Sequence, residues 1–192
     1  MKKRARNLLL ELLSAAERGD APGIGAAVDA GARVDGFLPE EGLTALMIAA
    51  ATGREDCIRA LGRAGARLDK ASPGEAPALH RAVESGQTWA ALCLLRLGAD
   101  PNAKCPDGLA PLHRAAKFGD ATAARALIEA GAEVSVYDGD GFTPWRVARQ
   151  EGFENVVDAL EGALGRRAFQ AELRMELGEG KLGVGSAPRT RL

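Results

Sequence analysis

Apolar residues recur along this chain at the spacing of one helix face, in short segments separated by glycine. Leu112, Ala115 and Ala116 stand at positions i, i+3 and i+4, which puts their side chains on one face of a helix. A second apolar segment, with Leu127 and Ile128, follows. The same two-part pattern occurs twice before it, with Leu46, Ala49, Ala50, Ile58 and Leu61, and then with Leu79, Ala82, Val83, Leu94 and Leu95. The pattern predicts a series of paired short helices.

The glycines show that this pattern is a repeat of constant length. Gly53, Gly86, Gly119 and Gly152 are equally spaced, and Gly65, Gly98 and Gly131 follow three of them at a second constant interval. The segments TALMIAA (44–50), PALHRAV (77–83), APLHRAA (110–116) and TPWRVAR (143–149) occupy equivalent positions. An earlier, divergent copy contains Gly19 and Gly31, and one additional residue lies in the connection DGFLPEEG (35–42). Self-similarity at a fixed period of about 33 residues predicts stacked structural repeats.

Local chemistry predicts where each helix begins and ends. Thr44 and Thr143 can accept hydrogen bonds from free N–H groups at a helix start, and Pro111 and Pro144 fit a first helical turn. Glycine adopts the left-handed conformation at a helix C-terminus at little cost, so Gly119 and its equivalents end the first helix of each pair. Because one pair is too small to bury its own apolar face, it is stabilised by stacking on the next. We therefore expect an open, curved solenoid.

These residues resemble the ankyrin repeat, whose pattern runs G-x-T-P-L-H-x-A-A-x-x-G and continues into an apolar helix ending L-L-x-x-G-A-D. The closest copy is GLAPLHRAAKFGDATAARALIEAGAEV (108–134), and GADPNAKCPDG (98–108) is similar to the family's connection between repeats. The resemblance covers about residues 8–163 and implies an all-α ankyrin-repeat solenoid of helix-turn-helix units joined by hairpin loops. It implies an ankyrin repeat domain over residues 1–163, with repeats at about 6–37 (N-terminal cap), 42–70, 75–103, 108–136 and 141–163 (C-terminal cap).

The two ends of the chain depart from the internal pattern. The first copy lacks the T-P-L-H segment and carries Arg6, Glu11, Glu17 and Arg18 among its leucines, as expected of a unit with one neighbour and one solvent face. The last copy is also rich in charged residues. Residues 164–177 are predicted to form a further amphipathic helix, and the glycine-rich residues 178–192 are expected to be disordered.

Composition and charge narrow the classes of function. The 192 residues contain 25 Lys and Arg against 26 Asp and Glu, a formal net charge of −1, so bulk electrostatics does not indicate a nucleic-acid or anionic-membrane partner. The basic segment KKRAR (2–6) is interpreted as a solvated helix start, and the alternative is a nucleic-acid or targeting signal. Glu11 interrupts the N-terminal apolar run, which argues against a signal peptide, and the apolar stretch 45–51 is far shorter than the roughly 20 residues of a membrane span. Three cysteines without C-x-x-C spacing argue for a reducing compartment. We expect a soluble, cytoplasmic monomer.

His80 and His113 are the two histidines and stand at the same repeat position. The ankyrin resemblance implies a structural histidine that hydrogen-bonds within the region of the short helix and hairpin, commonly with the threonine of the same motif. In this chain Pro77 and Ala110 replace that threonine in the two copies with histidine, and the two copies with threonine lack the histidine. We therefore expect weaker local capping than in a consensus repeat, with stability resting more on the stack.

The sequence contains no arrangement typical of catalysis or metal binding. Cys57 and Cys93 fall on second helices, where a small apolar residue suits the core, and Cys105 falls in the loop KCPDG, where an exposed thiol is expected. A metal site built from Cys105 and His113 would need two further ligands at zinc-like distances, and no C-x-x-C or H-x-x-x-H spacing supplies them. Serine-hydrolase, P-loop and dinucleotide-binding motifs are absent. We expect no catalysis, no metal and no cofactor.

The resemblance implies a partner-binding surface, because in ankyrin-like stacks the loop tips and the exposed side of the first helices form a concave groove that holds a partner, usually a protein. Positions that vary within the motif are free to recognise that partner. Aromatic and arginine side chains, the types enriched at binding hot spots, gather at such positions in adjacent repeats. The predicted partner-binding residues are Arg81, Glu84, Leu109, Arg114, Lys117, Phe118, Tyr137, Asp138, Phe142 and Arg146.

Two tryptophans remain to be placed. Trp145 occupies the leucine position of its motif and is predicted to lie in the core. Trp89 stands at the beginning of a second helix. Its side chain is either an exposed anchor for a partner or packed against its neighbour, and packing is favoured. Taken together, the sequence predicts a non-catalytic protein–protein interaction module. The alternative is a regulatory or inhibitory protein that occludes the active site of an enzyme or toxin.

Overall fold

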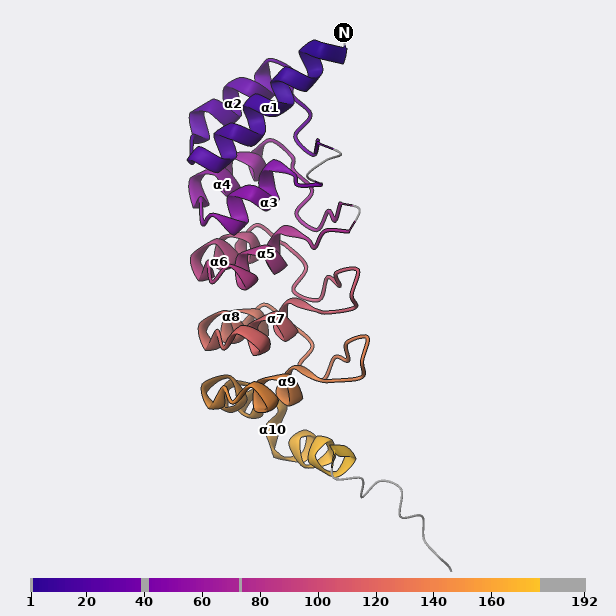
Figure 1. Cartoon of the computed structure of the whole chain (residues 1–192). Coiled ribbons are helices and arrows are strands. Elements are labelled where there is room, and N and C mark those ends of the chain that lie inside the picture. Colours follow the sequence, from indigo (N-terminus) through magenta and orange to yellow (C-terminus); the bar gives the residue numbers. More distant parts are fainter. Residues whose placement is uncertain (1, 39–41, 73, 177–192) are drawn as a thin grey trace, which may run out of the picture.

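The computed structural model describes the backbone of residues 2–38, 42–72 and 74–176 and the side chains of residues 3–38, 42–72 and 74–165. Within these residues, helices stack in pairs and long loops project from one side (Figure 1). The helices are α1 (Lys2–Arg18), α2 (Ala21–Asp29), α3 (Ala45–Ala51), α4 (Glu55–Arg63), α5 (Ala78–Glu84), α6 (Thr88–Arg96), α7 (Pro111–Phe118), α8 (Ala121–Glu129), α9 (Pro144–Glu151) and α10 (Glu154–Glu176). The predicted all-α repeat fold is confirmed. The loops that join one pair to the next, such as residues 97–110 and 130–143, are called fingers below.

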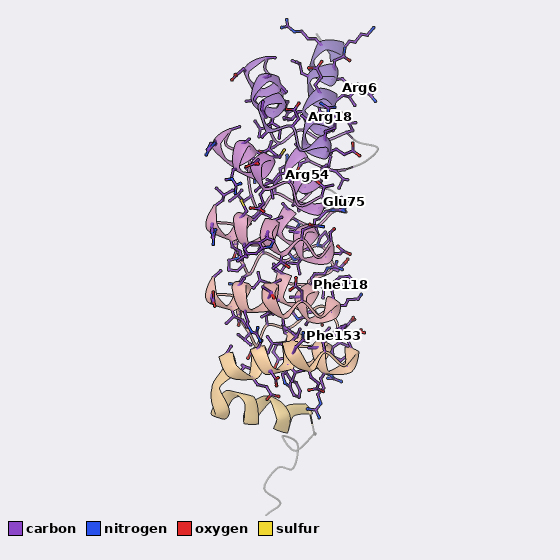
Figure 2. All side chains as sticks on the ribbon, turned by 90° about the vertical axis from the view of Figure 1, so that its left-hand side faces the viewer. Arg6, Arg18, Arg54, Glu75, Phe118 and Phe153 are labelled. Carbon is purple, nitrogen blue, oxygen red and sulfur yellow. The ribbon has the colours of Figure 1, made fainter. Side chains whose placement is uncertain are left out.

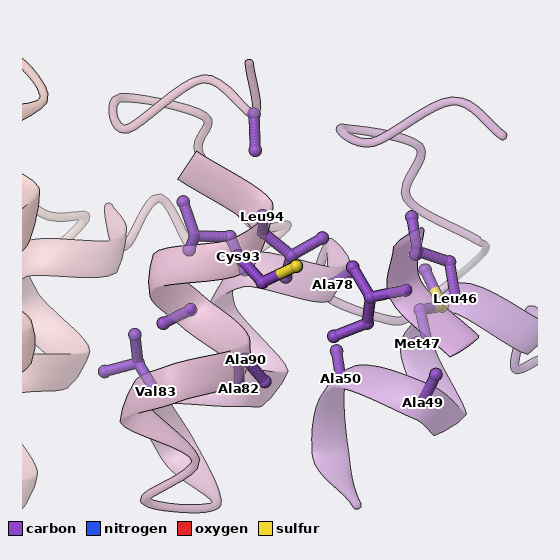
Figure 3. Packing of buried hydrophobic residues seen from close by; sticks show 14 of the residues in the cluster. Leu46, Met47, Ala49, Ala50, Ala78, Ala82, Val83, Ala90, Cys93 and Leu94 are labelled. Carbon is purple, nitrogen blue, oxygen red and sulfur yellow. The ribbon is translucent and has the colours of Figure 1, made fainter. Parts of the chain in front are cut away.

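Equivalent residues of successive repeats form one continuous core. First helices pack on first helices, from α1 through α3, α5 and α7 to α9, and second helices pack on second helices in the same order. Leu61, Leu94, Leu127 and Leu160 occupy the same position of successive second helices, and all four are fully buried. Buried alanines of α3 and α5 lie between the first helices and allow them to approach closely (Figure 3). The repeat spacing of the sequence therefore becomes the layer spacing of the core.

The helix starts differ in how well they are capped. The hydroxyls of Thr44 and Thr143 each accept a hydrogen bond from the backbone N–H three residues on, at 3.2 and 3.4 Å. Asp20 and Asp120 cap α2 and α8 in the same way, both at 2.9 Å. The helices α4, α5, α6 and α7 have no side-chain cap. The two threonines therefore satisfy a free N–H group, as predicted, and the copies without threonine lack that bond.

Glycine is required where the first helices turn into the second ones. Gly119 ends α7 with φ 71°, a left-handed conformation that other residues adopt at a cost. A Cβ atom at Gly119 would also lie only 2.5 Å from the Phe153 ring of the next repeat. This glycine therefore serves both the turn and the contact between repeats.

Side chains at one position of successive fingers hold the fingers together. Asp35, Asp69 and Asn102 each accept a hydrogen bond from a backbone N–H of the following finger, at 3.0, 2.9 and 2.7 Å. These bonds repeat with the period of the sequence. They satisfy backbone N–H groups of the fingers, which lie outside the helices and so have no partner within a helix. The fingers are therefore a second ordered layer, parallel to the helical one.

The C-terminal helix contains a break. Gly165 has φ 68° and ψ 156°, which is not helical, and divides α10 into two helical segments. The second segment, up to Glu176, occupies the region where the sequence predicts an additional helix. The predicted disordered tail, residues 178–192, lies outside the described residues.

Candidate partner-binding surface

The two histidines are buried at the bases of the fingers. Nε2 of His80 lies 2.9 Å from the Leu109 carbonyl oxygen, and Nε2 of His113 lies 3.0 Å from the Phe142 carbonyl oxygen. Because a carbonyl oxygen only accepts, each Nε2 carries the proton and donates it. Burial lowers the pKa of both imidazoles, partly opposed by these hydrogen bonds. The predicted structural role is confirmed, since each neutral histidine anchors the finger that follows it.

The other imidazole nitrogen distinguishes the two repeats. The backbone N–H of Ala110 donates to Nδ1 of His113 at 3.2 Å. Pro77, at the equivalent position before His80, has no N–H. Among the described residues, Nδ1 of His80 is buried without a hydrogen-bond partner. Of the repeats 75–103 and 108–136, local capping is therefore poorer in the first, which contains Pro77.

Two expectations about single side chains are wrong. Cys105 is only 5% exposed, because its backbone N–H donates to the Leu109 carbonyl oxygen at 3.0 Å and closes the finger over the side chain. Trp89 does not pack against its neighbour and is 69% exposed. It lies next to Ala90 and Ala91 on α6, whose buried side chains mark the opposite face of the helix.

Three other expectations about single residues are confirmed. Cys57 and Cys93 are buried on second helices, and Trp145 is buried in the last repeat. The indole N–H of Trp145 donates to the Glu161 carboxylate at 3.1 Å. The larger aromatic ring thus fills the leucine position and satisfies its polar group locally.

Arg81, Glu84 and Arg114, all predicted partner-binding residues, line one polar pocket of about 270 Å³ between neighbouring repeats. Nη1 of Arg114 lies 3.6 Å from a Glu84 carboxylate oxygen, and Nη2 lies 3.8 Å from one of Asp107. Arg81 forms an ion pair with Glu75. Sequence reasoning missed Glu75 and Asp107, which lie in irregular fingers shortly before a first helix. The pocket brings together charges from two first helices and two fingers.

A second group lies on the 130–143 finger and the start of α9. The Arg146 guanidinium stacks over the Phe142 ring, 4.3 Å from its centroid. The Tyr137 side chain is 48% exposed nearby on the finger. Asp138, by contrast, accepts hydrogen bonds from two backbone N–H groups of its own finger, at 2.8 and 3.0 Å. Asp138 therefore shapes the turn, and Tyr137, Phe142 and Arg146 present side chains around it.

The remaining predicted residues are more scattered. Leu109 is half-buried at the base of its finger. Lys117 and Phe118 are exposed at the C-terminal end of α7, away from the fingers. Phe118 directly precedes the turn glycine Gly119, and in Figure 2 it lies above Phe153, whose ring is beside that glycine. The ten predicted residues thus do not form one cluster. Leu109 lies apart at the base of its finger, and the other nine fall into three groups: a finger group (Tyr137, Asp138, Phe142 and Arg146), a pocket group (Arg81, Glu84 and Arg114) and a turn group (Lys117 and Phe118).

The described residues set limits on other chemistry. Among them, no three or more His, Cys, Asp or Glu side chains gather closely enough to hold a metal ion. No helix in the described part of the chain combines the length and apolarity needed to cross a membrane.

Comparison with known proteins identifies the repeat. The family model for ankyrin repeats, built from three copies, matches residues 12–105 and 79–164. No curated protein matches the chain. Ankyrin repeat proteins are generally non-catalytic modules for protein–protein interaction. Because the family model matches well over half of the residues, the chain belongs to the ankyrin repeat family.

Proposed function

We propose that this protein binds a partner protein through the fingers and first helices of its last three repeats. The proposed surface is the one predicted from the sequence: Arg81, Glu84, Leu109, Arg114, Lys117, Phe118, Tyr137, Asp138, Phe142 and Arg146. The observation that carries the proposal is the exposure of two large aromatic side chains on it, 45% for Phe118 and 48% for Tyr137. Covering such side chains contributes about 1–2 kcal/mol each, which is a strong contribution to an interface.

The spacing of these side chains favours a macromolecular partner. Phe118 is the last residue of α7, whereas the fingers join the first helices at their N-terminal ends. Seven helical steps separate the two ends of α7, which is about 10 Å. A partner that contacts both Phe118 and Tyr137 must therefore span the length of a first helix, which suits a protein segment better than a small molecule.

The finger group is already organised for contact. Stacking on Arg146 holds the Phe142 ring in one orientation, and hydrogen bonds from the finger backbone hold Asp138. Side chains that are ordered before binding lose less conformational entropy in a complex. This order supports recognition by a defined surface rather than by loose loops.

The test is affinity capture with the full chain from a lysate of the organism that makes it. We expect a partner that the native chain retains and that is lost when Arg114, Phe118, Tyr137 and Phe142 are all changed to alanine. The matched control is Trp89→Ala, which removes a more exposed aromatic ring from a second helix and should leave capture unchanged. Circular dichroism verifies that both variants fold. Retention by the fourfold variant, or loss in Trp89→Ala, would contradict the proposed surface.

If the captured partner is an enzyme, its activity with and without the chain separates two modes of action. Unchanged activity indicates a scaffold, and lost activity indicates an inhibitor that occludes the active site.

A further inference from the structure

Arg114 is a largely buried cation that forms no hydrogen bond with the described residues. Its side chain is only 13% exposed, and a guanidinium carries five N–H donors. Its Nε–H is buried without a partner, and the described residues form no hydrogen bond with the rest of the group. Most buried polar groups in proteins are hydrogen-bonded, so an exception calls for an explanation.

The two neighbouring carboxylates do not satisfy this guanidinium. Glu84 and Asp107 lie 3.6 and 3.8 Å from Nη1 and Nη2, beyond the 2.7–3.2 Å of a good N–H···O bond. Both carboxylates are well exposed, at 42% and 74%, so water solvates them. They supply charge balance at the rim of the pocket while the nitrogens at the end of Arg114 keep free donors.

We propose that the pocket between Arg81 and Arg114 receives a carboxylate from the partner, an Asp or Glu side chain that hydrogen-bonds to Nη1 and Nη2 of Arg114. This inference rests on the proposed function and specifies the chemistry of the partner. A planar carboxylate matches the guanidinium fork with two parallel hydrogen bonds. The pocket, about 270 Å³ in volume, has room for the end of such a side chain.

The burial of the charges decides between an acidic and a basic ligand. The lining side chains carry three carboxylates and two guanidinium groups, so a Lys or Arg of the partner would also find opposite charge. However, Glu84 and Asp107 are hydrated, and a cation would have to displace that water from them. The Arg114 side chain is 13% exposed and has no acceptor within hydrogen-bond distance among the described residues, so a carboxylate supplies bonds that none of those residues provides. The structure therefore favours the acidic ligand.

The second arginine of the pocket already has a carboxylate partner. Arg81 and Arg114 occupy the same position of successive repeats. Arg81 is paired with Glu75, yet its Nε–H is also buried without a partner. The Glu75 carboxylate therefore balances the charge of Arg81, which leaves Arg114 as the arginine of this pocket with free donors at its end.

The test uses a random peptide library displayed on phage and selected against the full chain. We expect the enriched peptides to share an Asp or Glu at one fixed position. In a synthetic copy of the best peptide, exchange of that residue for Asn or Gln should weaken binding by roughly 30-fold or more, because an interfacial charge loses its hydrogen-bonded partner. Arg114→Gln should cause a similar loss, and the exchange in the peptide should then have no further effect.

Two further variants keep the test informative if Arg114→Gln folds poorly. Arg125→Gln removes one exposed positive charge from α8 of the same repeat and should leave binding within about threefold. The double variant Glu84→Gln with Asp107→Asn removes the carboxylates that share Arg114 and should tighten binding of the acidic peptide. If a cation were the ligand, the same double variant would weaken binding.

Each outcome supports or overturns the inference. A fixed basic residue in the enriched peptides, no fixed charge, or acidic peptides that bind Arg114→Gln as well as the native chain would overturn the carboxylate site. If any of these peptides no longer bound the Tyr137→Ala variant, the carboxylate site would be wrong but the proposed binding surface would still be supported. A selection that enriches no peptide at all would count against both.

Discussion

Pro77→Thr should make the protein more stable, although it removes a proline. Nε2 of His80 donates to the Leu109 carbonyl oxygen, so Nδ1 is an acceptor, and it has no partner among the described residues. The new residue would supply an N–H to this Nδ1 and a hydroxyl to the free N–H groups of α5. Its backbone conformation suits threonine, since Pro77 has φ −55° and ψ 160° where Thr44 has −86° and 161°.

The expected gain follows from three contributions. A threonine cap is worth about 1 kcal/mol. A hydrogen bond to a buried, unsatisfied acceptor contributes about 1–3 kcal/mol. Loss of the proline's restriction on the unfolded chain costs about 0.4–1 kcal/mol. The net increase in the free energy of unfolding is about 1–3 kcal/mol, which raises Tm by roughly 2–10 °C in a chain of this size.

A matched series separates these contributions by urea unfolding followed by circular dichroism at pH 8. Ala110→Thr adds a cap where Nδ1 of the histidine is already bonded, so it should gain only about 1 kcal/mol. Pro77→Ala supplies the N–H without the hydroxyl and should fall between the native chain and Pro77→Thr. A Pro77→Thr variant no more stable than the native chain, or one that gains less than Ala110→Thr, would refute the reasoning.

Three further predictions concern stability. Burial lowers the pKa of His80 and His113 below the ordinary value of 6.5, so the unfolded chain binds more protons just below that pH. In urea unfolding, the free energy of unfolding should be level between about pH 7 and 8 and fall as the pH drops below 6.5. The double variant His80→Gln with His113→Gln should abolish this slope. Asp120→Ala removes the cap of α8 and a 2.8 Å bond from the Thr88 hydroxyl and should cost about 2 kcal/mol in urea unfolding. Trp145→Ala should lower the free energy of unfolding by about 3–5 kcal/mol because it empties a buried site. The control is the exposed Trp89→Ala, which should change it by no more than about 0.5 kcal/mol. An equal loss in both variants would contradict the burial of Trp145.

The fold was predictable because one short pattern specifies both the helices and their stacking. A glycine recurring once in every period ends each first helix, and leucines at the same period, such as Leu94 and Leu127, can only be buried by stacking. The structural role of the histidines followed from the same register. These inferences succeeded because they concern backbone conformation and the apolar face, which the period determines directly.

The pocket could not be predicted because its contacts do not follow the period. Arg114 meets Glu84 from the preceding first helix and Asp107 from a finger, and a finger has no regular spacing from which to infer where a side chain points. Cys105 shows the same limit, since its loop sequence suggests exposure and the hairpin bond to Leu109 buries it. The exposure of a residue on a second helix, such as Trp89, depends on how the helix is rotated about its axis. The apolar pattern defines this rotation only to within about one residue position.

His113 orders part of the proposed binding surface through the backbone. The Phe142 carbonyl oxygen accepts from Nε2 of His113 and from the Asp138 N–H, both at 3.0 Å, and the Phe142 N–H donates to the Asp138 carboxylate at 2.8 Å. Both backbone polar groups of Phe142 are therefore satisfied inside the protein, and the ring stacked on Arg146 is presented in one orientation. In the preceding finger, Cys105 stands at the position of Asp138. That finger has the equivalent hydrogen bond from Nε2 of His80 to the Leu109 carbonyl oxygen. It lacks the bond to a carboxylate, because cysteine has none. The better-held finger is thus the one that carries the exposed Tyr137, and low flexibility at this place favours recognition by the proposed surface.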